Sequence, residues 1–195
     1  MILTPEFYQQ TNVVAIARKL LGKVLITRIN GELSAGRIVE TEAYSFKERG
    51  CHAYNSRKTL RNEVMFADGG IAYVYLCYGI YNLFNVVTNK AGKAEAVLIR
   101  ALEPVAGHDI MLKRMNVKKL TRITSGPGKL TRAMGIDRTH NGVILTDSEI
   151  VIESDIIITP KNIVATTRIG IDYAGADAAL PWRFYVKDNE WISKW

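Results

Sequence analysis

The chain of 195 residues has only two cysteines, Cys51 and Cys77, and three histidines, His52, His108 and His140. Two cysteines cannot build a disulfide framework, and they cannot supply the four thiolates of a structural zinc site. The histidines are scattered along the sequence and lack the spacing of metal ligands. We therefore expect neither a disulfide framework nor a metal site.

Long apolar runs are also missing. No segment approaches the roughly 20 consecutive apolar residues of a transmembrane helix, and the first residues lack the basic and apolar regions of a secretory signal. No low-complexity linker, internal repeat or break in composition divides the sequence. We expect a soluble, cytoplasmic protein with one domain over residues 1–195, whose 48% hydrophobic residues suffice for a packed core.

Acidic residues are fewer than basic ones, with 19 Asp and Glu against 26 Lys and Arg and a net charge of +7. An excess of positive charge favours polyanionic partners such as nucleic acids. A solvated basic surface without any partner would give the same totals. The charge therefore indicates which partners are plausible and nothing about chemistry.

Two acids stand out in the predicted strand 37–44, which reads Arg-Ile-Val-Glu-Thr-Glu-Ala-Tyr. Alternate side chains of a strand face opposite sides of the sheet, so Glu40 and Glu42 share a face with Ile38 and Tyr44. Taken alone, this pattern is more typical of a polar stripe that faces solvent, because acids are almost never buried without a partner. Together with the tyrosines of the next hairpin, it indicates chemistry on a nucleic-acid base.

That hairpin consists of two predicted strands, 71–78 and 82–88, which follow a Gly-Gly turn and are separated by another glycine. Tyr73 and Tyr75 share a face, and core or cross-strand packing is the commoner role of aromatic residues in strands. Tyr78 is expected near the hairpin tip. An exposed aromatic side chain there could wedge between stacked bases.

The remaining elements are predicted from periodicity, capping residues and turn signals. They are a helix capped by Thr11 that runs from Val13 to Leu21, a strand at 23–28 joined by the Asn30-Gly31 turn to the antiparallel strand that carries Glu42, a buried strand at 96–99, helices at 108–115 and 130–134, strands at 143–145 and 156–159, and strand or loop elements at 166–171 and 183–186.

The basic segment 45–68 is long for a connection in a compact chain, which favours a binding loop. His52 lies within it, and a lone histidine is more often a surface or hydrogen-bonded core residue than a ligand-binding one. Arg100 closes the apolar run 96–99, and an arginine at the end of a buried strand needs a negatively charged partner. Glu42 is a candidate partner, and a structural ion pair with Glu103 or Glu153 is the alternative.

The segment 125–130, Ser-Gly-Pro-Gly-Lys-Leu, lacks the first glycine and the Ser or Thr of a Walker motif. It can still open a helix whose free N–H groups, with Lys129, would suit a backbone phosphate. A plain turn followed by a helix cap is the simpler interpretation.

Five ordered segments, at 36–44, 73–81, 96–104, 125–130 and 183–186, resemble the alkyladenine (3-methyladenine) DNA glycosylase family, which is distinct from the helix-hairpin-helix glycosylases. The resemblance implies a single-domain α+β fold with a curved, mainly antiparallel sheet, flanking helices and a protruding β-hairpin. It also implies a monofunctional DNA glycosylase that starts base excision repair without a metal or redox cofactor. The expected lesions are damaged purines of the 3-methyladenine, 7-methylguanine and hypoxanthine type.

The resemblance also assigns roles to individual residues. Glu42 would activate the attacking water, and Arg100 would help to hold that water. Side chains or backbone groups of five residues would bind the flipped base: Tyr44, His52, Tyr75, Asn85 and Ile171, the last through its backbone carbonyl near the water. Four residues would contact DNA: Tyr78 as the wedge, with Arg57, Arg61 and Lys129.

The expected partner is double-stranded DNA with damaged purines, bound by a monomer. Two other interpretations stay open on the residues alone. One is a non-catalytic nucleic-acid binding module in which the tyrosines stack bases and Glu42 is structural. The other is a basic interaction protein with an aromatic core.

Overall fold

The two longest strands, β2 (Glu32–Ser45) and β5 (Glu95–Ala106), lie side by side at the centre of an eight-stranded sheet. In this computed structural model, which describes residues 1–193, the strand order is β3-β4-β5-β2-β1-β6, and β7 and β8 extend the sheet from β2. Every strand pair among these residues is antiparallel. The predicted single α+β domain is confirmed.

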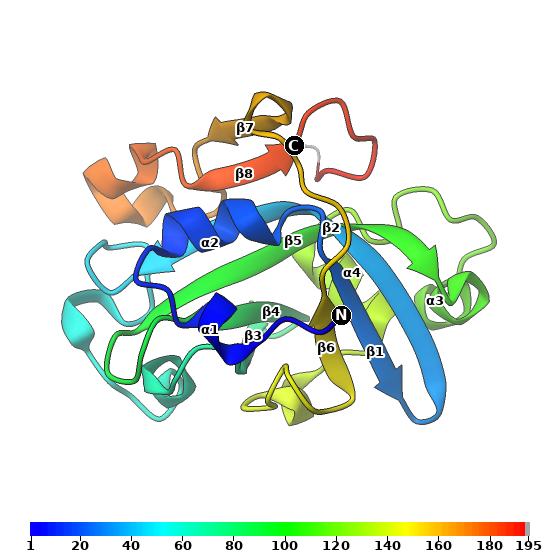
Figure 1. The fold of residues 1–195 in the computed structure, drawn as a ribbon, viewed down its shortest axis with the longest axis horizontal. Helices are drawn as coiled ribbons and strands as arrows, with labels where there is room; N and C mark the ends of the chain where they lie inside the picture. Colours follow the sequence, from blue (N-terminus) through cyan, green and yellow to red (C-terminus); the bar gives the residue numbers. More distant parts are fainter. Residues whose placement is uncertain (194–195) are drawn as a thin grey trace.

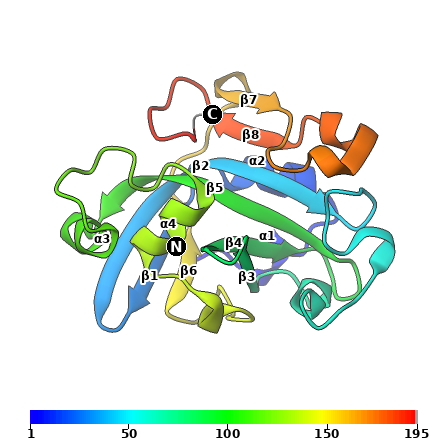
Figure 2. The same cartoon turned by 180° about the vertical axis from the view of Figure 1, so that it is seen from behind.

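The other elements complete this sheet and cover it (Figures 1 and 2). The strands are β1 (Val24–Ile29), β3 (Ala72–Cys77), β4 (Tyr81–Thr88), β6 (Ile150–Glu153), β7 (Ile163–Thr166) and β8 (Arg183–Val186). The helices are α1 (Pro5–Tyr8), α2 (Val13–Leu20), α3 (His108–Met115) and α4 (Pro127–Met134), with 3₁₀ turns at Tyr54–Ser56, Glu63–Phe66, Arg138–His140, Pro160–Asn162 and Asp172–Ala179.

Helix α2 lies against one face of the sheet, and α4 packs on the opposite face (Figures 1 and 2). The buried side chains of α2 recur at the helical spacing of positions 13, 16, 17 and 20. The predicted cap at Thr11 is wrong by one residue. The Asn12 side chain accepts the Ala15 N–H at 3.0 Å, because asparagine is an equally good capping residue and stands directly before the first helical turn.

The hairpin of β1 and β2 turns at Asn30 and Gly31, as predicted, and both residues have the positive φ angles, 54° and 76°, that a tight hairpin turn requires. One edge of β2 then pairs with β1 and β8 in succession. β1 covers residues 32–37, and β8 covers residues 40–42. Two register shifts against β5 flank Glu40, so the regular alternation assumed for this strand is interrupted there.

Two predicted strands are absent, and two observed strands, β6 and β7, were not predicted. Residues 143–145 form only an isolated bridge through Ile144, and residues 156–159 are irregular, with Ile157 85% exposed. To join the sheet as a strand, residues 156–159 would have to pair with the edge of β1 that does not face β2. That edge is already paired with β6. The segment 166–171 is a loop after β7, whereas the strand at 183–186 is confirmed.

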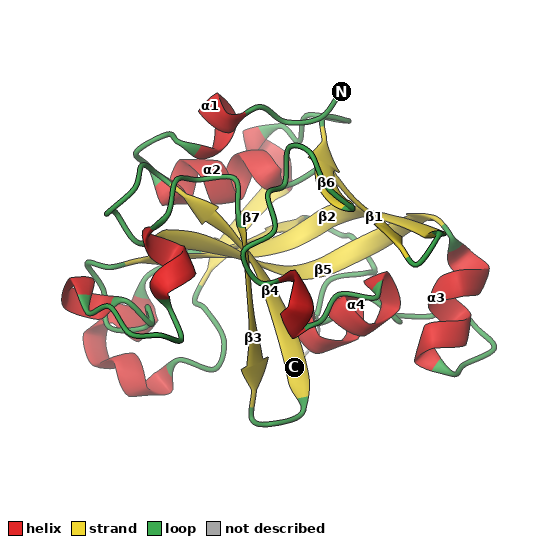
Figure 3. Ribbon diagram, turned by 90° about the horizontal axis from the view of Figure 1, so that it is seen from below, coloured by secondary structure: helices red, strands yellow, loops and turns green. Residues whose placement is uncertain are grey.

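The hairpin of β3 and β4 projects from the rest of the sheet (Figure 3). One main hydrophobic core joins both faces of the sheet to the helices, and a smaller one surrounds the base of this hairpin. No helix within residues 1–193 is long and apolar enough to cross a membrane. The fold therefore places the tyrosine-rich hairpin beside the ends of β2 and β5.

Candidate active site

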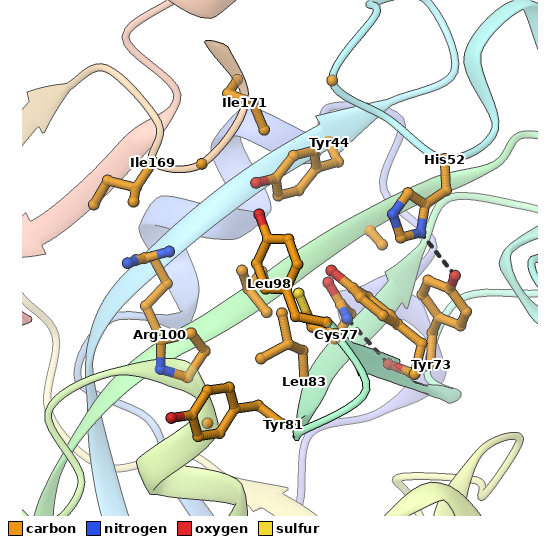
Figure 4. Close-up of a pocket in the computed structure, with 18 of the residues that line it drawn as sticks. Tyr44, His52, Tyr73, Cys77, Tyr81, Leu83, Leu98, Arg100, Ile169 and Ile171 are labelled. Carbon is orange, nitrogen blue, oxygen red and sulfur yellow. Dashed lines mark hydrogen bonds between the residues drawn. The ribbon is translucent and has the colours of Figure 1, made fainter. Parts of the chain in front are cut away.

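A cavity of about 720 Å³ opens between the β3–β4 hairpin, strand β5 and the loops that follow β2 and β7. Figure 4 shows aromatic side chains from several of these elements turned toward one another. Nine of the eleven predicted site residues line it: Tyr44, His52, Arg61, Tyr75, Tyr78, Asn85, Arg100, Lys129 and Ile171. Glu42 lies directly behind Tyr44, and exposed Arg57 lies outside the cavity.

The Glu42 carboxylate is completely buried. Tyr44 donates its hydroxyl to Oε2 at 2.7 Å, and the backbone N–H of Ile169 donates to Oε1 at 2.8 Å. The Arg100 Nη1 group is 3.4 Å from the same Oε1. The interpretation as a solvent-facing polar stripe is therefore wrong for Glu42, because these partners compensate its burial.

Burial raises the pKa of Glu42 above its ordinary 4.5, because desolvation disfavours the charged form. The positive Arg100, the Tyr44 hydroxyl and the Ile169 N–H act in the opposite direction, and the neighbouring Glu40 raises the pKa further. An elevated pKa in a carboxyl group beside a cavity is the property of a general base that works near neutral pH.

The sequence predicted that Arg100 closes its strand. This prediction is wrong, because β5 continues to Ala106 and Arg100 lies in its middle. Its guanidinium contacts Glu42 and also Glu40, whose Oε1 accepts from Nε at 3.0 Å. The alternative partners are engaged elsewhere. Glu103 pairs with Arg37 at 3.2 Å, and Glu153 pairs with the amino terminus at 3.9 Å.

Three aromatic rings form one wall of the cavity. The His52 and Tyr75 ring centroids are 4.7 Å apart, and those of Tyr73 and Tyr75 are 5.2 Å apart. His52 Nδ1 is 2.9 Å from the Tyr73 hydroxyl (Figure 4). Desolvation and then the nearby Arg61 lower the pKa of His52 to about 4, so its imidazole is neutral at physiological pH. Both tyrosines line the cavity, and Tyr73 is the more deeply buried of the two.

Asn85 is buried beneath these rings, and its amide donates to the backbone carbonyl of Tyr73 at 3.1 Å. This hydrogen bond fixes the orientation of the carboxamide. Cys77, Leu83 and Leu98 add apolar surface next to it (Figure 4). A flat, uncharged ligand would therefore meet aromatic and apolar groups on most sides.

Tyr78 stands at the hairpin tip with 83% of its surface exposed and a positive φ of 50°. Ile80 beside it is 70% exposed. Tyr81 packs on Gly128 in α4, where an added Cβ would lie 2.7 Å from the tyrosine ring. This close approach joins the hairpin to the segment 125–130 and leaves the tip itself free of packing.

The segment 125–130 does open helix α4, and Lys129 is exposed at the cavity rim. The Ser125 hydroxyl is buried and has no hydrogen-bond partner among residues 1–193. On the opposite rim, the exposed Arg61 guanidinium lies 5.3 Å from the centroid of the Tyr75 ring. Both rims of the cavity are therefore positively charged.

The loop after β7 approaches Glu42 through Ile169, and the sequence had pointed to Ile171. Both residues line the cavity (Figure 4). The carbonyl of Ile171 accepts the Ala174 N–H at 2.8 Å, whereas the Ile169 N–H reaches the carboxylate directly.

Arg168 and Glu48 hold this loop in place and were both missed. Two nitrogens of the buried guanidinium each lie 2.7 Å from an oxygen of Glu48, and the guanidinium also donates to the Ala43 carbonyl at 3.0 Å. Its Cζ is 4.8 Å from the Tyr44 ring centroid. An arginine between Thr167 and Ile169 was the available signal, but nothing in the sequence identified Glu48, 120 positions away, as its partner.

No group of three or more His, Cys, Asp or Glu residues that could hold a metal ion occurs within residues 1–193. Both cysteines are free thiols. The groups in and beside this cavity include carboxylates, arginines, aromatic rings and backbone N–H groups.

Replacing Glu48 with Gln leaves the Arg168 charge buried without its ion pair. We expect the free energy of unfolding to fall by about 3 to 5 kcal/mol, measured by chemical denaturation. The matched control is Glu103→Gln, which removes a half-exposed partner of Arg37 and should cost less than about 1 kcal/mol. Equal losses in the two variants would contradict a structural role for the Glu48 pair.

Comparison with known proteins agrees with this geometry. Three proteins named "Putative 3-methyladenine DNA glycosylase" are similar over nearly their whole length. Those of Clostridium botulinum (strain Alaska E43 / Type E3) and Carboxydothermus hydrogenoformans are 46% and 49% identical, with complete coverage of both chains. That of Methanocella arvoryzae is 47% identical over 99% of this chain and 96% of the relative.

The methylpurine-DNA glycosylase (MPG) family profile matches residues 6–190. The chain therefore belongs to this family of DNA glycosylases, and the resemblance seen in its motifs is confirmed.

Proposed function

We propose that this chain is a monofunctional glycosylase that removes damaged purines of the 3-methyladenine, 7-methylguanine and hypoxanthine type from double-stranded DNA and so starts base excision repair. The observation that carries the proposal is the buried Glu42 carboxylate behind an aromatic cavity. The names of the relatives support 3-methyladenine as one substrate. We propose that the protein acts as a monomer in the cytoplasm, where it meets chromosomal DNA.

A base inside a duplex is out of reach of Glu42, so it must first rotate into the cavity, at a cost of a few kcal/mol. Stacking on Tyr44 and Tyr75 would return about 1 to 3 kcal/mol for each aromatic contact. This gain offsets extrusion of a weakly paired, damaged base more easily than that of a normal base. Neutral His52 would complete the stack, and Asn85 would screen the edge of the base.

The groups around the cavity rim would hold the DNA. Tyr78, exposed at the hairpin tip, would fill the gap that the extruded nucleotide leaves in the stack. Arg57, Arg61 and Lys129 are exposed and would contact backbone phosphates, which position the duplex without reading its sequence. The unpartnered Ser125 hydroxyl next to α4 supports a phosphate contact near Lys129.

In the reaction, the N-glycosidic bond breaks and its electron pair leaves with the base, while positive charge develops on the sugar. Ionised Glu42 stabilises that charge and accepts a proton from the water whose oxygen bonds to C1′. Arg100 would help to hold this water. The Ile171 carbonyl, which already accepts the Ala174 N–H, would accept a hydrogen bond from the water with its second lone pair. A cationic methylated purine leaves as the neutral base, whereas hypoxanthine leaves as an anion and takes up a proton from solvent. The other product is an abasic sugar.

Glu42→Gln keeps the shape of the side chain but removes the base that accepts the proton. We expect the variant to bind duplex DNA containing hypoxanthine with nearly unchanged affinity and to release free base at least about 100-fold more slowly. Binding is measured by fluorescence anisotropy, and base release is measured by chromatography under single-turnover conditions.

The control for this experiment is Glu63→Gln, which changes an exposed acid. Full base release by Glu42→Gln would contradict the role of Glu42. Tight binding by the wild-type protein with no base release from hypoxanthine or methylated DNA would instead identify a non-catalytic binding module.

Tyr78→Ala removes the proposed wedge without touching the core. We expect weaker binding to hypoxanthine-containing duplex by about 1 to 3 kcal/mol and an unchanged melting temperature, because the side chain is 83% exposed. The control is Ile157→Ala, which removes another exposed apolar side chain at a position that does not line the cavity. Unchanged affinity in the Tyr78 variant would favour a protein that does not insert into DNA.

A further inference from the structure

Glu40 is buried next to the proposed catalytic pair and accepts more hydrogen bonds than Glu42 does. Its Oε1 accepts from Arg183 Nε at 2.7 Å, from the Ser193 hydroxyl at 2.7 Å and from Arg100 Nε at 3.0 Å. Its Oε2 accepts the Ser193 backbone N–H at 2.6 Å. Three of these four donors converge on Oε1, so this oxygen is the more fully engaged of the two.

The irregular backbone around Glu40 explains how these donors meet. β2 changes its edge partner from β1 to β8 just before this residue, and two register shifts against β5 flank it. Arg183 reaches Glu40 from β8, and Arg100 reaches it from β5. The chain then leaves β8 and forms the C-terminal segment, residues 187–193, which returns so that Ser193 contacts Glu40 (Figure 1).

The orientation of Arg100 depends on this cluster. Its guanidinium is held by Glu40 at 3.0 Å and faces the Ser193 hydroxyl at 3.4 Å, while its contact with Glu42 is also 3.4 Å. The shortest of these contacts is therefore the one to Glu40. Two carboxylates and two guanidiniums, of Glu40, Glu42, Arg100 and Arg183, balance their charges in a buried space.

We propose that Glu40 is a positioning residue that orients Arg100 toward Glu42, and that the C-terminal segment completes the active centre through Ser193. This inference rests on the proposed glycosylase function. Glu40 is not among the residues that line the cavity. It acts by fixing the guanidinium and by keeping a second negative charge near Glu42.

A merely structural Glu40 and a positioning Glu40 differ in their effect on pH dependence. The charged and titratable groups around Glu42 are Arg100 on β5, Arg168 on the loop after β7, Arg183 on β8, and Glu40 and Tyr44 on β2. Removing the charge of Glu40 takes away a like charge that raises the pKa of Glu42. This change favours the ionised form of Glu42 and moves the acidic limb of the rate profile to lower pH.

The test is Glu40→Gln compared with Glu190→Gln, which makes the same change at an exposed site in the C-terminal segment. Single-turnover release of hypoxanthine from duplex DNA is measured from pH 4 to 9 on folded protein. We expect Glu40→Gln to lower the maximal rate by about 10- to 100-fold and to move its acidic limb to lower pH. We expect Glu190→Gln to match the wild type.

Two further measurements test the proposal if Glu40→Gln folds poorly. Ser193→Ala removes the hydroxyl that faces Glu40 and Arg100 but leaves the backbone N–H, and it should slow base release with no shift of the acidic limb. Amide hydrogen exchange of residues 187–193 should be faster in Glu40→Gln than in Glu190→Gln. A wild-type rate in Ser193→Ala, or unchanged exchange in Glu40→Gln, would overturn the role of the C-terminal segment.

The outcomes separate this inference from the function on which it rests. A Glu40→Gln variant with a slower rate but an unshifted acidic limb, or with the wild-type rate and limb, overturns the positioning role and leaves the glycosylase function standing. Absence of base release by the wild-type protein overturns the proposed function itself, and the positioning role with it.

Discussion

The burial of an ionisable carboxylate is the constraint on which the rest of this structure depends. Glu42 has no contact with bulk water, and a charge in that position is tolerated only with compensating partners. A tyrosine hydroxyl, a backbone N–H and a guanidinium provide them, and each comes from a different part of the chain. Because all three must be held in place, the loop after β7 and the centre of β5 have little freedom to move.

The fold meets this requirement with a second layer of buried charges. Arg168 and Glu48 fasten the loop that donates to Glu42, and Glu40 fastens Arg100. Removing one member of such a pair costs more than the pair contributes, since the remaining charge stays buried. The hairpin tip takes no part in these buried ion pairs. Tyr78 can therefore contact a partner without loss of core packing.

Local sequence signals predicted much of the fold. The Asn30-Gly31 turn and the helix at His108–Met115 are where the sequence placed them, because turn chemistry and helical periodicity are decided by neighbouring residues. The choice between β6 and residues 156–159 is made by the edge of β1, which lies far away in the sequence. The motifs also pointed to Glu42, Arg100 and the aromatic residues that the structure brings together in and beside one cavity. They could not identify the contact of Ser193 with Glu40, since those residues are 153 positions apart.

The central claim is that an ionised, buried Glu42 drives base release. The pH dependence of single-turnover hypoxanthine release by the wild-type protein tests it most directly. Burial raises the pKa of Glu42 above 4.5, so the rate should fall on acidification with a midpoint above pH 4.5, and His52, with a pKa of about 4, should add nothing above pH 5. A rate constant that stays level from neutral pH down to pH 4.5 on folded protein would contradict the account.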